Sequence, residues 1–201
     1  MTFAVTAKLT GPPEADAAVI EQSWGRPERF AVIFERYFAP VHQYLARRVG
    51  DRAADDLAAE VFVAAFAQRQ RYDLARDCAR PWLYGIATNM IGTHRRQEQR
   101  LYRALARSSA RDASPSEEDR VTDRVSAAAA GSALAAALAE LDACDRDVLL
   151  LGALAGLDYQ QTAQALGIPY GTVCSRLNRA RCRVRQALGD TNPAGGQEGG
   201  R

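Results

Sequence analysis

Residues 170–188, "YGTVCSRLNRARCRVRQAL", have the composition of an anion-binding helix. They contain no acid and five arginines: Arg176, Arg179, Arg181, Arg183 and Arg185. Guanidinium groups bind phosphate in a bidentate manner, and surface helices normally mix charges of both signs. The stretch therefore predicts an anionic partner such as nucleic acid. An ordinary solvated helix rich in arginine is the alternative, because the net charge of the whole chain is only +2.

The residues just before this stretch predict a helix-turn-helix unit. Asp158 and Gln161 form a capping-box pattern that opens a short helix over 159–166. Gly167 ends that helix, Ile168 is placed to fill the corner, and Pro169 lies near the start of the next helix. This unit places its second helix in the major groove of duplex DNA.

The second helix divides into two faces when it is laid out at about 100° per residue. One narrow apolar stripe should face the core: Val173, Leu177, Ala180, Val184 and Leu188. Residues near the N-terminus of a reading helix reach base edges, and later ones reach phosphates. We therefore expect base contacts from Tyr170, Thr172, Ser175 and Arg176, and phosphate contacts from Arg179 and Arg183, with Arg181 or Arg185 as further candidates for phosphate.

Two further charge clusters lie in the first half of the chain. Acids gather near the start of an expected helix after Gly50: Asp51, Asp55, Asp56 and Glu60. On the residues alone, complementarity to the helix dipole is the simpler interpretation. Basic residues fill the second half of a long helix that begins near Pro81: Arg95, Arg96, Arg100, Arg103, Arg107 and Arg111. Trp82, Tyr84, Thr88 and Asn89 precede them, which suits stacking on single-stranded nucleic acid. We expect Trp82 to be mainly packed in the core and the arginines to contact mainly phosphate.

Helical periodicity dominates and strand signals are nearly absent, so we predict an all-α fold of two small domains. We expect a flexible lead-in at 1–27, a helical domain at 28–111, a linker at 112–133, a helix-turn-helix domain at 134–189 and a disordered tail at 190–201. In the first domain we expect Pro40 to begin a new helix, Gly50 to end it, Asp51 to cap the next, and 72–80 to form a loop.

Other function classes have little support in the sequence. Four cysteines without C-x-x-C spacing and two histidines make a metal site improbable, and we expect no cofactor. The sequence lacks an evident catalytic arrangement or glycine-rich phosphate loop, so we expect no enzyme activity. Without a signal peptide or an apolar run long enough to span a bilayer, we expect a cytoplasmic protein with no membrane insertion.

Both halves of the chain resemble one family, the extracytoplasmic-function (ECF) sigma factors of bacterial RNA polymerase. The first half does so through "FERYFAPVHQYLARRVGDRAADDLAAEVFVAAF" and "RPWLYGIATNMIGTHRRQEQR", and the second through "RDVLLL" and "GLDYQQTAQALGIPYGTVCSRLNRAR". The resemblance implies an alternative sigma factor that binds core polymerase, recognises −35 and −10 promoter elements and assists melting.

The resemblance also implies a role for each cluster. By position, the core-polymerase contacts would be Asp55, Asp56, Leu57 and Glu60, docking on the β′ clamp helices, with the β flap as a further polymerase partner. The −10 element, melted to single strands, would be read by Tyr72, Arg80, Trp82, Asn89, Arg95, Arg96 and Arg100. The duplex −35 element would be read by Tyr170, Thr172, Val173, Ser175, Arg176, Arg179 and Arg183. Such factors commonly have an anti-sigma factor as a partner.

The sequence departs from the family pattern at a few positions. Asp142 stands where proline is usual, which would let the preceding helix run on, and Cys174 stands where a basic residue is common. The alternatives are a helix-turn-helix regulator that binds duplex DNA without polymerase, usually as a dimer, and a small helical enzyme. The acidic helix and the second basic helix argue against the regulator.

Overall fold

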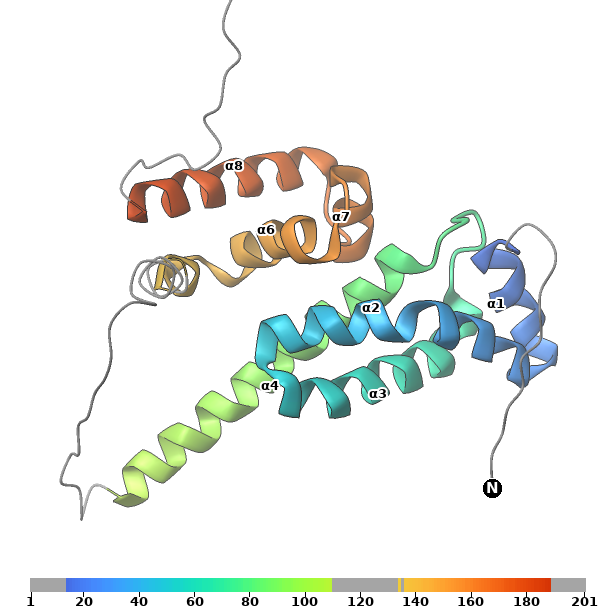
Figure 1. Ribbon diagram of the computed structural model, residues 1–201, viewed down its shortest axis with the longest axis horizontal. Coiled ribbons are helices and arrows are strands. Elements are labelled where there is room, and N and C mark those ends of the chain that lie inside the picture. The colour runs from blue at the N-terminus through green and yellow to red at the C-terminus, as the bar shows by residue number, and fades with distance from the viewer. Residues whose placement is uncertain (1–13, 110–133, 135, 189–201) are drawn as a thin grey trace, which may run out of the picture. The chain divides into compact units, whose positions relative to one another are not determined.

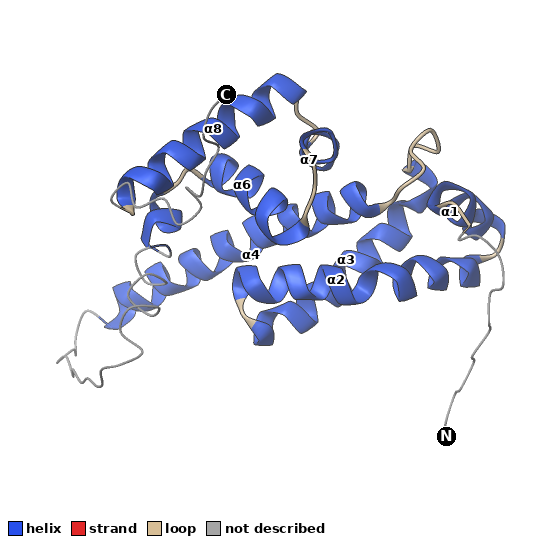
Figure 2. Cartoon of the chain, turned by 45° about the horizontal axis from the view of Figure 1, so that its top comes forward, coloured by secondary structure: helices blue, strands red, loops and turns tan. Residues whose placement is uncertain are grey.

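The computed structural model describes residues 14–109, 134 and 136–188, with the backbone alone for 96–109. Every regular element in these ranges is a helix, which confirms the all-α prediction (Figure 2). Over the same ranges, each helix is too short or too polar to cross a lipid bilayer. The chain divides into two compact units between Ile91 and Gly92. The predicted linker at 112–133 and tail at 190–201 lie outside the described residues.

The first unit is built from α1 (Asp16–Gly25), the 3-10 turn η1 (Pro27–Phe30), α2 (Ala31–Val49), α3 (Asp51–Gln68), the 3-10 turn η2 (Arg69–Arg71) and the start of α4 (Arg80–Ser109) (Figure 1). Helices α2 and α3 form an antiparallel pair. Their shared core contains Val41 and Leu45 from α2 and Ala54, Ala58 and Val61 from α3, each with no exposed surface.

Gly50 makes the turn between α2 and α3. Its N–H donates to the Ala46 carbonyl at 2.9 Å, and its own carbonyl accepts from the Ala54 N–H at 3.1 Å. Its φ of +88° and ψ of 159° lie in a region that only glycine adopts without strain. The prediction that Asp51 caps α3 is therefore wrong, because Gly50 occupies the cap position and Asp51 lies in the first turn without a side-chain cap bond.

Helix α2 continues through Pro40, so the prediction of a new helix there is wrong. Proline removes one backbone hydrogen bond and normally breaks or kinks a helix. Here the buried residues Ile33, Val41 and Leu45 keep one helical phase on both sides of Pro40. Burial of that continuous stripe holds both halves of α2 in one helix.

The prediction of a flexible lead-in over 1–27 is wrong for the part that the structure describes. Residues 16–25 form α1, in which Val19, Ile20 and Ser23 have no exposed surface. The glycines and prolines around it suggested a loop, but burial of one apolar face stabilises even a short helix.

Helix α4 begins at Arg80, with Pro81 in its first turn as predicted. Tyr44 and Tyr84 join α2 to α4, since their rings meet edge to face with centroids 5.1 Å apart. The Tyr44 hydroxyl lies 3.0 Å from the Thr88 hydroxyl, and the Tyr84 hydroxyl donates to the Pro40 carbonyl at 3.2 Å. The expected loop at 72–80 precedes α4, from Tyr72 to Ala79.

The second unit contains helical residues 136–140, α6 (Ala143–Ala155), α7 (Tyr159–Leu166) and α8 (Tyr170–Ala187). Helix α8 packs along α6, and α7 contacts both (Figure 1). The helix before Asp142 does not run on, because Asp142 adopts an extended ψ of 143° as the N-cap residue of α6. The Arg146 guanidinium closes the end of that helix by donating to the carbonyls of Leu138, Ala139 and Leu141.

The predicted helix-turn-helix is confirmed in detail. The Gln161 N–H donates to the Asp158 carboxylate at 2.7 Å, and the Asp158 N–H donates to the Gln161 side chain at 3.2 Å. Gly167 ends α7 with a left-handed φ of +63°. Ile168 packs against the buried cluster of Val148, Val173 and Leu177, so it fills the corner as expected.

Candidate nucleic-acid interface

Helix α8 presents most of its predicted −35 residues to solvent. Tyr170 is 52% exposed, Ser175 and Arg183 are exposed, and Thr172 and Arg176 are half-buried. The Ser175 hydroxyl donates to the Thr172 carbonyl at 3.0 Å, which leaves its oxygen free to accept a bond from a base or a bound water.

Val173 does not belong to this surface, so its assignment to DNA contact is wrong. Its side chain has no exposed area and packs in the cluster with Val148 and Leu177. The helical phase that makes Val173 an anchor for α8 also turns it away from any ligand on the exposed face.

Arg179 is held by an acid from another helix. Its Nε and Nη2 donate to the two carboxylate oxygens of Asp145 at 2.5 and 2.6 Å. Asp145 lies on α6 and is fully buried, whereas the Arg179 side chain is 52% exposed. The hydrogen bonds from Arg179 hold the pKa of Asp145 below its usual range, and the same bonds raise the pKa of Arg179.

Arg183 has a weaker acidic neighbour, because its Nη1 lies 3.5 Å from a carboxylate oxygen of Asp142. The stretch 170–188 is acid-free in sequence, but α6 supplies it with counter-charge across the helix pair. Part of the counter-charge for these arginines therefore comes from the protein itself. Among the described residues, Arg176 and Arg185 form no ion pair, so part of the positive charge of α8 has no paired acid.

Helix α3 presents its acids to solvent and buries its leucine. Asp55, Asp56 and Glu60 are exposed, and His42 Nε2 of α2 lies 2.7 Å from a carboxylate oxygen of Asp55. Leu57 is only 4% exposed, so its assignment as a direct partner contact is wrong. Its side chain belongs to the apolar stripe that fixes α3 in the unit.

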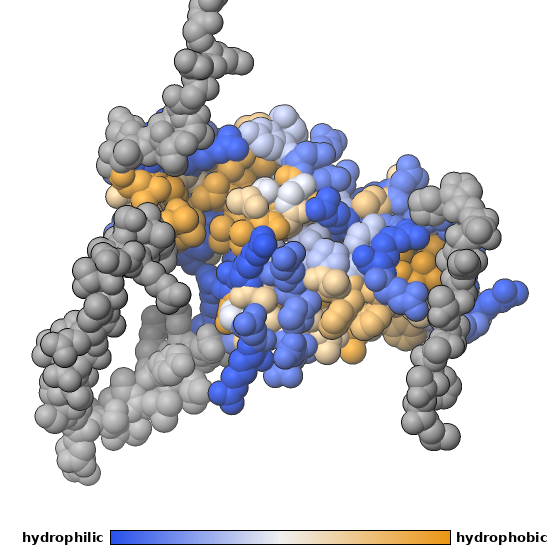
Figure 3. Space-filling view, viewed as in Figure 1, coloured by the Kyte–Doolittle hydropathy of each residue, from blue (hydrophilic) through white to orange (hydrophobic). Residues whose placement is uncertain are grey.

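The exposure of two apolar residues near these acids was not predicted from the sequence. Val63 is 70% exposed and lies one turn beyond Glu60, and Phe34 of α2 is 41% exposed. Phe34 contacts Phe38 and Phe62, with ring centroids 4.8 and 5.0 Å apart. Apolar side chains gather over α2 and α3, with polar ones beside them (Figure 3). Apolar residues at helical spacing predict burial from the sequence. Phe34 and Val63 are exposed because no element within the described residues covers them.

Three of the predicted −10 residues, Tyr72, Arg80 and Trp82, lie in the loop before α4 and in the first turn of that helix. The Tyr72 and Trp82 rings pack with centroids 5.0 Å apart. Tyr72 is 6% exposed, and its hydroxyl donates to the Arg76 carbonyl at 2.6 Å. Burial raises the pKa of Tyr72 above its usual range. The Arg80 guanidinium lies over the Tyr84 ring, 5.8 Å from its centroid.

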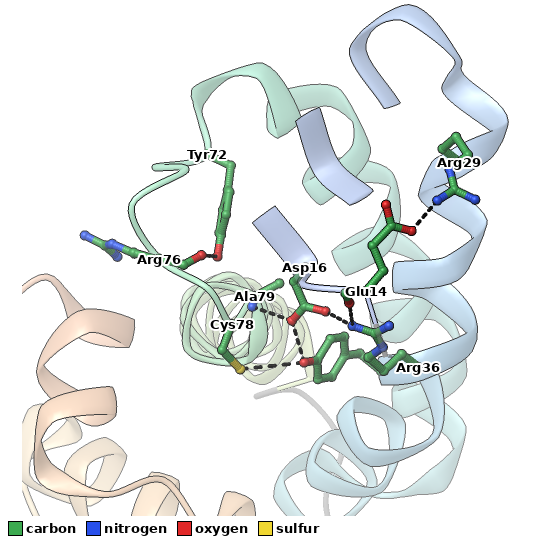
Figure 4. A network of polar contacts seen from close by, with 9 residues as sticks. Glu14, Asp16, Arg29, Arg36, Tyr72, Arg76, Cys78 and Ala79 are labelled. Carbon is green, nitrogen blue, oxygen red and sulfur yellow. Dashed lines mark hydrogen bonds and ion pairs between the residues drawn. The ribbon is translucent and has the colours of Figure 1, made fainter. Parts of the chain in front are cut away.

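Farther along α4, Asn89 is exposed and Arg95 is half-buried. The side chains of Arg96 and Arg100 lie outside the described residues, so their predicted contacts remain predictions. Sequence reasoning also missed Asp16 of α1, which is 2% exposed and whose carboxylate bonds to Arg36 and Tyr37 of α2 and to the Ala79 N–H before α4 (Figure 4).

Comparison with known proteins agrees with both units. Residues 33–101 match the family model of Sigma-70 region 2, and residues 132–184 match that of Sigma-70, region 4. The chain is 33% identical over 189 residues to the ECF RNA polymerase sigma factor SigC of Mycobacterium tuberculosis (strain CDC 1551 / Oshkosh). The alignment covers 94% of this chain and 97% of the relative, with the same values for the probable RNA polymerase sigma-C factor of Mycobacterium bovis.

Solved structures share the fold. CnrH, in complex with the cytosolic domain of CnrY, gives a TM-score of 0.60 at 23% identity over 88% of this chain and 99% of that chain. The sigma factor RpoE of Bartonella quintana, in complex with the anti-sigma factor NepR, gives 0.57 at 20% identity over 81% and 98%. The chain therefore belongs to the ECF family of RNA polymerase sigma factors, and it is an alternative sigma factor that directs transcription initiation.

Proposed function

We propose that α8 reads the −35 element as duplex DNA in the major groove. Tyr170, Thr172, Ser175 and Arg176 would reach base edges, because they line the accessible N-terminal half of the helix. Arg183 would contact a phosphate. The bonds to Asp145 use Nε and Nη2 of Arg179 and leave its Nη1 for a second phosphate contact.

The loop at 72–80 and the start of α4 would read and melt the −10 element. A base that leaves the stack needs an aromatic or apolar pocket and a few kcal/mol of compensation. The packed pair of Tyr72 and Trp82 offers one such platform. Asn89 offers an exposed amide about two turns farther along α4, on the same side of the helix as Trp82. Arg80 and Arg95, with Arg96 and Arg100 farther along α4, would follow the backbone phosphates.

The exposed face of α3 would dock on the β′ clamp helices of core polymerase. Asp55, Asp56 and Glu60 supply negative charge, and the exposed Val63 and Phe34 supply apolar area beside it. Charge would guide the encounter and apolar burial would add affinity. We further propose that the second unit contacts the β flap.

An anti-sigma factor is a further proposed partner. RpoE of Bartonella quintana, whose fold is similar, was solved with the anti-sigma factor NepR. A cytoplasmic, non-enzymatic role follows from the proposed partners, because promoter DNA and polymerase require neither a membrane nor a catalytic site on this chain.

One observation carries the proposal: a single chain presents a cationic reading helix on one unit and an acidic, partly apolar helix face on the other. A regulator that works without polymerase has no use for the second surface. Transcription from duplex templates randomised around −35 and −10, with core polymerase and the full chain, should enrich two short motifs at one spacing. Binding of the chain alone to duplex DNA, with no enriched transcript, would instead support the regulator.

A further inference from the structure

Helix α1 holds both ends of the segment that precedes α4. At its C-terminal end, the Trp24 indole N–H donates to the Arg69 carbonyl at 3.2 Å, and Arg69 Nε donates back to the Ser23 carbonyl at 3.2 Å. The Arg69 guanidinium is itself fixed, because it lies 3.9 Å from the centroid of the Phe66 ring and donates to the Phe66 carbonyl at 2.7 Å. The chain therefore leaves η2 in a defined direction.

At the N-terminal end of α1, Asp16 holds the other end of the same segment. Its backbone N–H donates to the Asp77 carbonyl at 3.2 Å. Its carboxylate accepts from the Ala79 N–H at 2.7 Å, as Figure 4 shows. The carboxylate also accepts from the Tyr37 hydroxyl at 2.6 Å and from the Arg36 guanidinium. A buried carboxylate with several donors is a firm anchor, since each donor compensates for lost hydration.

The bond to Ala79 also acts on α4. Ala79 is the residue before Arg80, where α4 begins, and the first turn of α4 contains no acid. In a capping box, a glutamate of the same helix accepts the N–H at this position. Here Asp16 supplies that carboxylate from a different helix, and its charge also suits the positive end of the α4 dipole.

Between its two fixed ends the segment has its own hydrogen bonds. The Asp73 carboxylate accepts from the Ala75 N–H and from Arg76 Nε, each at 3.1 Å. The Tyr72 hydroxyl donates to the Arg76 carbonyl, and the Tyr72 ring packs on Trp82. The segment therefore has one defined shape, and that shape depends on where α1 holds its ends.

We propose that α1 is a brace for promoter reading, and that Asp16 is a positioning residue for recognition of the −10 element. Asp16 touches no DNA in this scheme: it fixes the loop at 72–80 and the first turn of α4, which carry the reading side chains. The inference rests on the proposed role of this loop. It adds that −10 discrimination depends on an element outside the Sigma-70 region 2 match, which begins at residue 33.

The test is the substitution Asp16→Asn in the full chain, assembled with core polymerase and assayed on the randomised −35 and −10 duplex templates. A single mismatched base costs roughly fivefold or more in a well-read site. In Asp16→Asn, we expect the ratio of transcription from matched templates to transcription from mismatched templates to fall towards one at −10 positions. The same ratio should stay unchanged at −35 positions. Hydrogen exchange at the amides of 72–80 should accelerate, while core binding should match that of the unmodified chain.

Two further variants make the result decisive. Glu14→Gln is the matched control, because it removes the exposed Glu14–Arg29 ion pair at the same end of α1 without touching the loop; its −10 ratio should not change. Trp24→Phe keeps an aromatic ring but removes the N–H donor to Arg69, so it should weaken discrimination at −10 positions and leave −35 positions unchanged. This variant still tests the inference if Asp16→Asn disturbs the whole unit.

Unchanged −10 ratios in both Asp16→Asn and Trp24→Phe would overturn the inference, as would equal losses at −10 and −35 in both variants. The reading role of the loop is tested separately through Asn89→Ala. If the unmodified chain shows no −10 preference, or if Asn89→Ala leaves that preference intact, the proposed function of this surface fails. If Asn89→Ala weakens the −10 preference and the α1 variants leave it intact, only the proposed role of α1 as a brace is refuted.

Discussion

At the scale of single residues, the arginines of α8 differ in the partners that the protein already gives them. Arg179 is bound bidentately by a buried aspartate, and Arg183 lies near an exposed one. Arg176 forms no ion pair among the described residues and lies in the N-terminal half of the helix, which we propose reads base edges. Similar side chains on one helix are therefore available to DNA to different degrees.

Replacing Arg176 with alanine should cost about 1–3 kcal/mol of binding at one −35 base and relax the preference there. Relative transcription from templates that differ at single −35 positions would measure this. Arg185→Ala is the matched control, since it lies about 180° from Arg176 around α8. It should leave the base preference intact. A −35 profile that Arg176→Ala does not alter would rule out its role at a base edge.

Replacing Asp145 with asparagine should remove a pH-dependent part of the stability of the second unit. The pKa of Asp145 is lower in the folded chain than its ordinary value of about 4, because Arg179 binds the charged form. The stabilisation is therefore present above pH 4 and is lost as the pH falls through the lowered pKa. Hydrogen exchange of α6 and α8 in the full chain should show this acid-dependent loss of protection, and Asp145→Asn should not.

At neutral pH, Asp145→Asn should also destabilise these helices by about 1–3 kcal/mol, because Arg179 keeps its charge but loses its anionic partner, and the amide has one acceptor oxygen in place of two. Asp142→Asn is the control: its pair with Arg183 is long and exposed and should contribute less than about 1 kcal/mol. Equal exchange rates in both variants would show that the buried pair contributes no more than the exposed one.

At the scale of elements, turns decide how each face is presented. The α2–α3 turn at Gly50 fixes the direction of α3, whose exposed acids form the proposed polymerase surface. A methyl group at Gly50 would meet no atom within 4 Å, so only the backbone conformation opposes a larger residue there. The acidic face is thus positioned by a conformational requirement of one glycine.

Gly50→Ala should destabilise the first unit by about 1–3 kcal/mol, because alanine is strained at this φ and ψ. Both tryptophans, Trp24 and Trp82, lie in this unit, so urea unfolding followed by tryptophan fluorescence reports on it. Gly25→Ala at the end of α1 is the control, since Gly25 lies in the same unit, also has open space and lacks a left-handed φ. It should be neutral or slightly stabilising. An unchanged midpoint for Gly50→Ala would refute the conformational argument.

At the scale of the whole molecule, positive and negative charge are separated among surfaces with different proposed partners. The net charge of +2 conceals this separation. Reversing charge on one surface should therefore affect one partner and spare the other. This is a stronger test of a sigma factor than loss of transcription, which any unfolded variant would also show.

Glu60→Arg should weaken holoenzyme formation by about tenfold or more, because a like charge at a complementary interface costs several kcal/mol. Association of the labelled chain with core polymerase at low and high salt would measure it, and the defect should shrink as salt rises. Glu35→Arg on α2 makes the same change in net charge at another exposed site and is the control. Equal defects in the two variants would point to overall charge instead of a docking face.

The sequence by itself determined the features that depend on near neighbours. The capping box of Asp158 and Gln161, the left-handed Gly167 and the apolar spacing of Val173, Leu177 and Ala180 each act within a few residues. They were enough to predict the helix-turn-helix and the all-α fold, because helix boundaries and helical phase are local properties.

Only the tertiary structure decided the features that depend on residues far apart in the chain. Asp145 lies 34 positions before Arg179, and Asp16 lies 63 positions before Ala79, yet each pair forms hydrogen bonds. Likewise, Leu57 and Val63 are both apolar residues of α3, and only packing buries the first and exposes the second. Charge compensation, the brace and the exposed apolar face all arise from such contacts, and no local sequence rule encodes which distant side chain will be close.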